Sequence, residues 1–134
     1  MLFARIVLAA AALVYLALGI FFLAAPELAA TGLCYWLGGP TAFTEFRAFY
    51  GGLEIGLAAF LATCAAVRRF VPAGLLALLL LCGGTAAGRL TGMALDGSRS
   101  ALVALPLAGE LAAAALAAIA LWRLGPPPAE SPAN

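Results

Sequence analysis

The residues best suited to chemistry are charged side chains that stand inside long apolar segments. They are Arg47, Glu54, Arg89 and Glu110. A buried charge is costly unless a partner or ligand meets it. Carboxylates can move protons or accept hydrogen bonds, and arginines can bind anions. We take these four residues, with Tyr50 as a neighbouring hydrogen-bond donor, as the candidate ligand-binding site or buried polar network.

The composition places these charges in a membrane. Hydrophobic residues make up 66% of the chain and charged residues 10%, and the mean hydropathy is +1.11. Such values are far from those of soluble proteins. A net charge of +1 gives no sign of the basic surface that binds nucleic acid. All basic residues are arginines, and the commonest residues are alanine, leucine and glycine. We therefore expect a multi-pass protein of a bacterial cytoplasmic (inner) membrane.

Histidine and cysteine usage argues against several chemistries. Histidine, the commonest general base and a common metal ligand, is absent. The three cysteines, Cys34, Cys64 and Cys82, form no Cys-x-x-Cys pair. We therefore expect no metal, no haem and no other cofactor, and interpret Cys64 and Cys82 as small packing residues.

The elements that must position the charges are apolar runs at about residues 6–25, 44–67, 71–94 and 101–122. Each is long enough for a helix that crosses ~30 Å. The pattern predicts an all-α, transmembrane four-helix bundle within residues 1–124. The proline-rich segment 125–134 is expected to be a disordered tail.

Arginine placement predicts the orientation, because short cytoplasmic loops are enriched in Lys and Arg. One side of the membrane would carry Arg5, Arg68, Arg69 and Arg123, and the opposite side Glu27, Asp96 and Arg99. Both termini are therefore predicted to be cytoplasmic.

The charged second span is marginal by itself. A charge at the centre of a span raises the free energy of membrane insertion by about 2.5 to 3.5 kcal/mol. This approaches the favourable insertion free energy of the large apolar residues in that span. At 100° per residue Arg47, Tyr50 and Glu54 fall on one face. We expect Arg89 and Glu110 to meet this face in the outer half of the bundle. Two interpretations stay open: an ion-pair network that fixes helix packing, or a polar pocket.

Glycines at a spacing of four predict close helix contacts. Gly84, Gly88 and Gly92 form such a ridge in the third span. Gly52 and Gly56 repeat the spacing in the second span, almost opposite Glu54, where a homodimer contact is one interpretation.

The segments "EFRAFYGGLEIGLAAF" and "GRLTGMALDG" resemble the domain of unknown function family 4345. More distantly, the chain resembles the DoxX-type four-helix membrane proteins. The resemblance runs from the first span to Trp122 and implies four transmembrane helices. It also implies a matching segment of Arg47, Tyr50, Gly51 and Gly52. It implies no reaction.

Three function classes remain. We favour an accessory or binding protein that holds a lipid-like, quinone-like or amphipathic molecule, with Arg47 and Arg89 as anion partners. The second is a proton-coupled exporter in which Glu54 or Glu110 cycles protons. The third is a membrane enzyme of isomerase type that uses one of these glutamates as acid or base.

Overall fold

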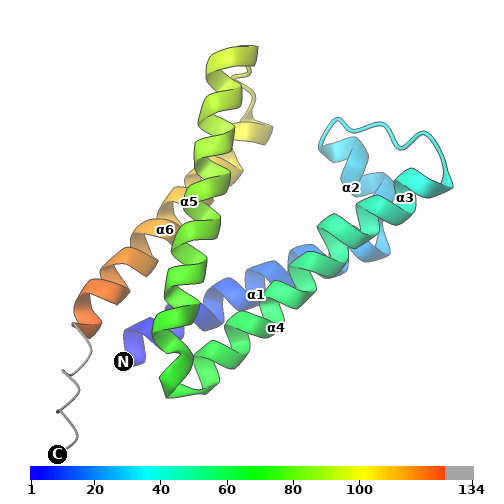
Figure 1. Ribbon diagram of the computed structural model, residues 1–134. Coiled ribbons are helices and arrows are strands. Elements are labelled where there is room, and N and C mark those ends of the chain that lie inside the picture. Colours follow the sequence, from blue (N-terminus) through cyan, green and yellow to red (C-terminus); the bar gives the residue numbers. More distant parts are fainter. Residues whose placement is uncertain (126–134) are drawn as a thin grey trace, which may run out of the picture.

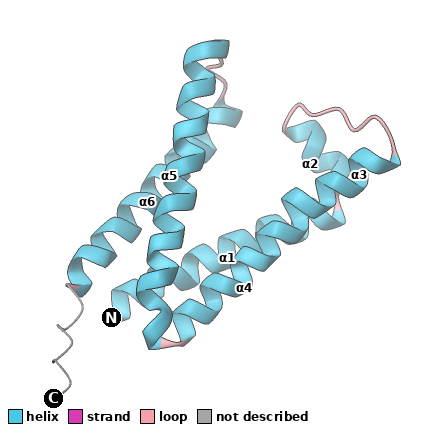
Figure 2. Cartoon of the chain, viewed as in Figure 1, coloured by secondary structure: helices cyan, strands magenta, loops and turns pink. Residues whose placement is uncertain are grey.

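The computed structural model describes residues 1–125, and helices account for most of that part of the chain (Figure 2). In order, the elements are α1 (Leu2–Ala24), α2 (Pro26–Gly32), α3 (Pro40–Phe46), a π-helical segment η1 (Arg47–Gly52), α4 (Leu53–Ala66), a 3-10 turn η2 (Arg68–Phe70), α5 (Val71–Asp96) and α6 (Ala101–Leu124).

Four helical stretches are long and apolar enough to cross a membrane. They are Leu2–Ala24, Pro40–Ala66, Arg68–Asp96 and Ala101–Leu124. The predicted all-α fold is confirmed, with four helices able to span a membrane, whereas their arrangement as a four-helix bundle stays a prediction. The observed spans are longer than predicted at most ends, and the short helix α2 was not expected. The predicted tail, beyond Gly125, lies outside the described residues.

The spans form two antiparallel hairpins (Figure 1). In the first hairpin α1 packs along η1 and α4, and in the second α5 packs along α6. The hairpins meet at the end that holds Met1, η2 and Leu124, which we call the closed end. They diverge toward the end that holds α2 and the α5–α6 turn at residues 97–100, which we call the open end (Figure 1).

A shared apolar core holds the closed end together. Its largest fully buried side chains include Leu8 from α1, Leu61 from α4, and Leu75 and Leu78 from α5. The same cluster contains Ala117 and Ala120, which are the only buried residues of α6. Cys64 and Cys82 are free, buried members of this core, in agreement with the packing role predicted for them.

A second, smaller core lies at the open end and belongs to the first hairpin alone. Ala29 and Ala30 of α2 pack on Phe46 of α3, with Phe22 and Tyr50 against them. Helix α2 therefore folds back over the hairpin and covers these aromatic side chains. No residue of α5 or α6 takes part in this cluster.

Close backbone contacts within the first hairpin depend on glycine. A Cβ at Gly19 would lie 2.9 Å from both the Gly51 oxygen and the Ile55 nitrogen. A Cβ at Gly51 would lie 3.0 Å from the Leu23 Cβ. Small residues allow helices to approach closely in membranes, and these two glycines hold α1 against η1 and the start of α4.

Two arginines link the antiparallel helices of this hairpin at opposite ends. At the closed end Arg5 Nε of α1 donates to the Ala65 carbonyl at 2.7 Å. At the open end Arg47 Nε of η1 donates to the Leu23 carbonyl at 3.2 Å. The last carbonyls of a helix lack intrahelical partners and carry partial negative charge. Each helix therefore supplies, near its start, the cation that caps the end of the other.

Candidate functional site

Arg89 and Glu110 form an ion pair across the second hairpin. Arg89 Nε lies 3.0 Å from both carboxylate oxygens of Glu110. The side chain of Arg89 is 37% exposed and that of Glu110 is 16% exposed. Each of the two charges thus has its partner on the neighbouring helix, and the pair as a whole is neutral.

Glu54 has no such partner in the described part of the chain. Its Oε2 atom is inaccessible and accepts no hydrogen bond from residues 1–125. The residue lies within the continuous helix Pro40–Ala66, just after the π-helical segment, so no free helix N-terminus is next to the carboxyl group.

Tyr15 connects the two hairpins beside these carboxylates. Its hydroxyl lies 3.5 Å from Cys82 Sγ, so it reaches from α1 to α5. Glu54 on the first hairpin and Glu110 on the second both lie near this hydroxyl. Tyr15 itself packs against the closed-end core.

Sequence reasoning missed Tyr15, although a signal was present. A tyrosine near the middle of an apolar span places a hydroxyl where water is absent, and buried tyrosine hydroxyls usually find a partner. The need of that hydroxyl for a hydrogen-bond partner was the signal that the first span carried.

Arg47 lies apart from the other charges. Its Nε is committed to the Leu23 carbonyl, and its side chain is exposed beside α2. The structure thus brings Arg89 and Glu110 together, gives Arg47 a backbone partner, and leaves Glu54 unpaired. The expected meeting of all four charges does not occur among the described contacts.

The π-helical segment explains why the predicted polar face of the second span is divided. At its end the Leu53 amide donates to the Ala48 carbonyl, five residues earlier. A π turn contains one residue more than an α turn. Residues before it are therefore rotated relative to those after it, compared with a regular α-helix. Arg47 and Glu54 stand on opposite sides of that turn.

Tyr50 faces an aromatic cluster at the open end. Its ring stacks on Phe46 with centroids 4.6 Å apart and meets the edge of Phe22 at 5.6 Å. Its hydroxyl donates to the Tyr35 hydroxyl at 3.2 Å. The predicted donor is thus engaged with the loop after α2.

The predicted glycine ridges have no neighbour within the described chain. A Cβ at Gly56, Gly84 or Gly88 would meet no atom within 4 Å. One at Gly92 would meet only Asp96 of its own helix at 3.5 Å, and one at Gly52 only the Arg47 carbonyl at 3.8 Å. Their role in a contact with another chain stays a prediction.

Residues 1–125 contain no group of three or more Cys, Asp or Glu side chains placed to hold a metal ion. The groups near the hairpin junction can exchange hydrogen bonds and protons. They comprise an unpaired carboxyl, a tyrosine hydroxyl, a thiol and a neutral ion pair.

Residues 3–121 match the family model of a domain of unknown function, DUF4345. Neither a curated protein sequence nor a solved structure matches the chain. The more distant resemblance to the DoxX-type proteins therefore stays a prediction.

Proposed function

The chain belongs to the DUF4345 family, and we propose that it binds a lipid-like or amphipathic small molecule where its two hairpins diverge. The observation that carries this proposal is the inaccessible, unpaired Oε2 of Glu54. In this proposal the protein resides in a bacterial inner membrane, and the ligand enters from the lipid phase.

The unpaired oxygen calls for a donor. A buried acceptor left without a hydrogen bond costs about 1 to 3 kcal/mol. Water normally removes this cost at a surface, but the interior of a bilayer contains none. A ligand hydroxyl or amine that donates to Glu54 would recover that energy. A quinone-like ligand would instead require the protonated acid as donor to its carbonyl oxygen.

The surroundings of Glu54 favour a ligand with a small polar group and an apolar body. Arg89 is occupied by Glu110, and Arg47 caps α1 on another face, so no unpaired cation stands beside Glu54. We therefore propose a ligand that carries a hydrogen-bond donor, instead of the anionic ligand expected from the sequence. Tyr15 and Cys82 add neutral polar groups where the two hairpins meet.

The exporter and isomerase alternatives both depend on Glu54 in this arrangement. Both oxygens of Glu110 lie 3.0 Å from Arg89 Nε, so a substrate or a proton would have to compete with Arg89 for them. A proton carrier or a general acid must be able to change its protonation state. Of the two glutamates that these alternatives invoke, Glu54 is the one without an ion pair in residues 1–125.

Native mass spectrometry of the detergent-purified protein tests the proposal. The wild type should retain a copurifying small molecule. Glu54→Leu should reduce its occupancy about fivefold, because a hydrogen bond contributes about 1 kcal/mol. The same variant should still fold, because leucine leaves no buried acceptor unpaired when the ligand is absent.

Glu45→Leu is the matched control, because Glu45 is an exposed carboxylate of the same span. It should leave the bound molecule in place. Equal retention of the molecule by Glu54→Leu and the wild type would overturn the proposal, as would a wild type that carries no small molecule from the membrane.

A further inference from the structure

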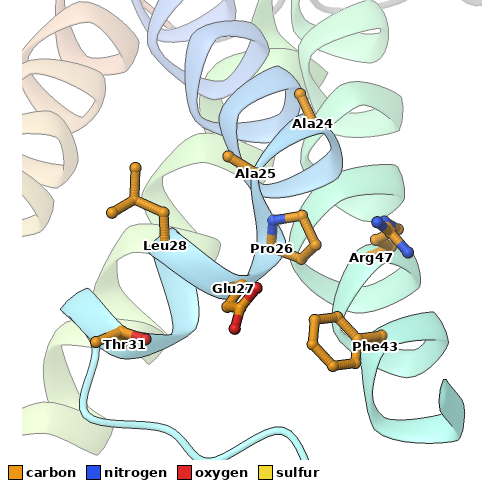
Figure 3. Close-up of a pocket in the computed structure, with 8 residues that line it drawn as sticks. All are labelled: Ala24, Ala25, Pro26, Glu27, Leu28, Thr31, Phe43 and Arg47. Carbon is orange, nitrogen blue, oxygen red and sulfur yellow. The ribbon is translucent and has the colours of Figure 1, made fainter. Parts of the chain in front are cut away.

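A hollow of about 600 Å³ lies at the open end, beside the join between α1 and α2 (Figure 3). Its lining comes from the end of α1, from α2 and α3, and from η1. It lies where α1 ends and α3 begins, on the first hairpin alone. Neither Glu54 nor any residue of α5 or α6 lines it, so it is separate from the site proposed between the hairpins.

Two opposite charges line this hollow. They are Glu27 of α2 and Arg47 of η1, drawn on either side of Pro26 in Figure 3. The ion pair found within residues 1–125 is that of Arg89 and Glu110, so Glu27 and Arg47 do not neutralise each other. Arg47 bonds the Leu23 carbonyl through Nε, and its terminal nitrogens donate to no group of the described chain.

The hollow continues along α2. A second one of about 480 Å³ shares Glu27, Thr31 and Phe43 with it and extends to Trp36. Trp36 is 75% exposed, and Leu28, on the rim of the first hollow, is 66% exposed. Exposed tryptophan at the end of a span is typical of the head-group region of a membrane. This tendency predicts that the paired hollows lie at the level of lipid head groups.

We propose that this hollow binds the head group of a phospholipid that carries a primary ammonium, of the phosphatidylethanolamine class. The planar guanidinium of Arg47 suits a phosphate. The carboxylate of Glu27 suits an ammonium that can donate N–H hydrogen bonds. A choline head group has no such donor, and an anionic head group without an ammonium meets the like charge of Glu27.

The apolar rim suits the rest of such a lipid. Leu28 and Phe43 flank the charges and offer contacts to the upper acyl chains. This lipid would lie against the outside of the first hairpin, whereas the molecule proposed at Glu54 lies between the hairpins. The two proposals therefore involve different residues and fail independently.

Competition between lipids in native mass spectrometry tests this inference. Full-length protein in detergent receives equal amounts of phosphatidylethanolamine, phosphatidylcholine and phosphatidylglycerol with identical acyl chains. The phosphatidylethanolamine adduct should exceed each of the others about two- to fivefold, the factor expected from one exposed ion pair.

Glu27→Gln should abolish the preference for phosphatidylethanolamine over phosphatidylcholine. Glu27→Lys should make phosphatidylglycerol the favoured lipid. Glu45→Gln, which changes an exposed carboxylate that does not line the hollow, should keep the wild-type order. Glu54→Leu should also keep it, which separates this site from the one proposed above.

Equal adducts of all three lipids on the wild type would overturn the inference. So would a wild type that prefers phosphatidylglycerol, because the hollow would then recognise anions only. An unchanged preference in Glu27→Gln would show that Glu27 does not select the ammonium.

Discussion

The closed and open ends of this protein differ in what holds the helices together. At the closed end α1, α4, α5 and α6 share one apolar core with fully buried leucines. At the open end each hairpin has its own contacts. Aromatic rings and α2 cover the first hairpin, and the ion pair of Arg89 and Glu110 links the second.

The difference follows from the side chains available in each half. Lipid is as apolar as leucine, so transmembrane helices associate through close packing and hydrogen bonds. Alanine, cysteine and Gly74 let the two hairpins approach each other at the closed end. In the open half the spans carry Glu54, Arg89 and Glu110, whose side chains are only partly buried. A fold stabilised at one end leaves the other end free to host a polar site.

The largest expected effect concerns which end faces the cytoplasm. We predict that the closed end, which gathers Arg5, Arg68, Arg69 and Arg123, is cytoplasmic. Alkaline phosphatase fused after Trp36 should then be active in cells, and fused after Arg69 it should be inactive. The reverse pattern of activity would invert the assignment of the two ends.

The next effect concerns the ion pair that links the second hairpin. Glu110→Ala should lower the free energy of unfolding by about 3 kcal/mol, because it leaves Arg89 unpaired within the membrane. Thermal unfolding in detergent, followed by the loss of the monodisperse peak in gel filtration, measures the change.

The double variant Arg89→Met with Glu110→Met is the control for this prediction. Replacing both members of an ion pair that is withdrawn from water by apolar residues is often neutral or stabilising. The double variant should therefore unfold near the wild-type temperature. A single Glu110→Ala variant as stable as the wild type would mean that the pair does not hold the second hairpin.

The smallest effect compares two glycines of α5, one in each half. A Cβ at Gly74 would lie 2.5 Å from the Cys64 Cβ, whereas one at Gly84 would meet no atom within 4 Å. Gly74→Ala should destabilise by about 1 to 3 kcal/mol through overpacking. Gly84→Ala should stabilise by about 0.5 to 1 kcal/mol, since alanine is the better helix former. The same thermal assay tests both, and equal melting temperatures would contradict the proposed difference in packing.

The spans could be predicted from sequence because their signals are local. Long apolar runs, prolines at the starts of α2, α3 and α5, and the left-handed Gly97 after α5 all act within a few residues. Helix α2 escaped prediction because its sequence, "PELAATG", is short and lacks a long apolar run.

The candidate site was predicted in part. The charges in the spans marked the right residues, and Arg89 and Glu110 do lie together. The partner of Arg47 could not be foreseen, because it is a backbone carbonyl at the end of α1 and carries no side-chain signature. The π turn in η1 could not be foreseen either, since a regular helix of 100° per residue was assumed for that span.

The sequence by itself determined that the chain is helical, apolar enough for a membrane, and charged at a few positions in its spans, because hydropathy and helix length depend on nearby residues only. The tertiary structure decided which charges meet. It pairs Arg89 with Glu110, turns Arg47 toward α1 and leaves Glu54 without a donor. These outcomes depend on the divergence of the two hairpins and on helix rotation, and both arise from packing between residues far apart in the chain.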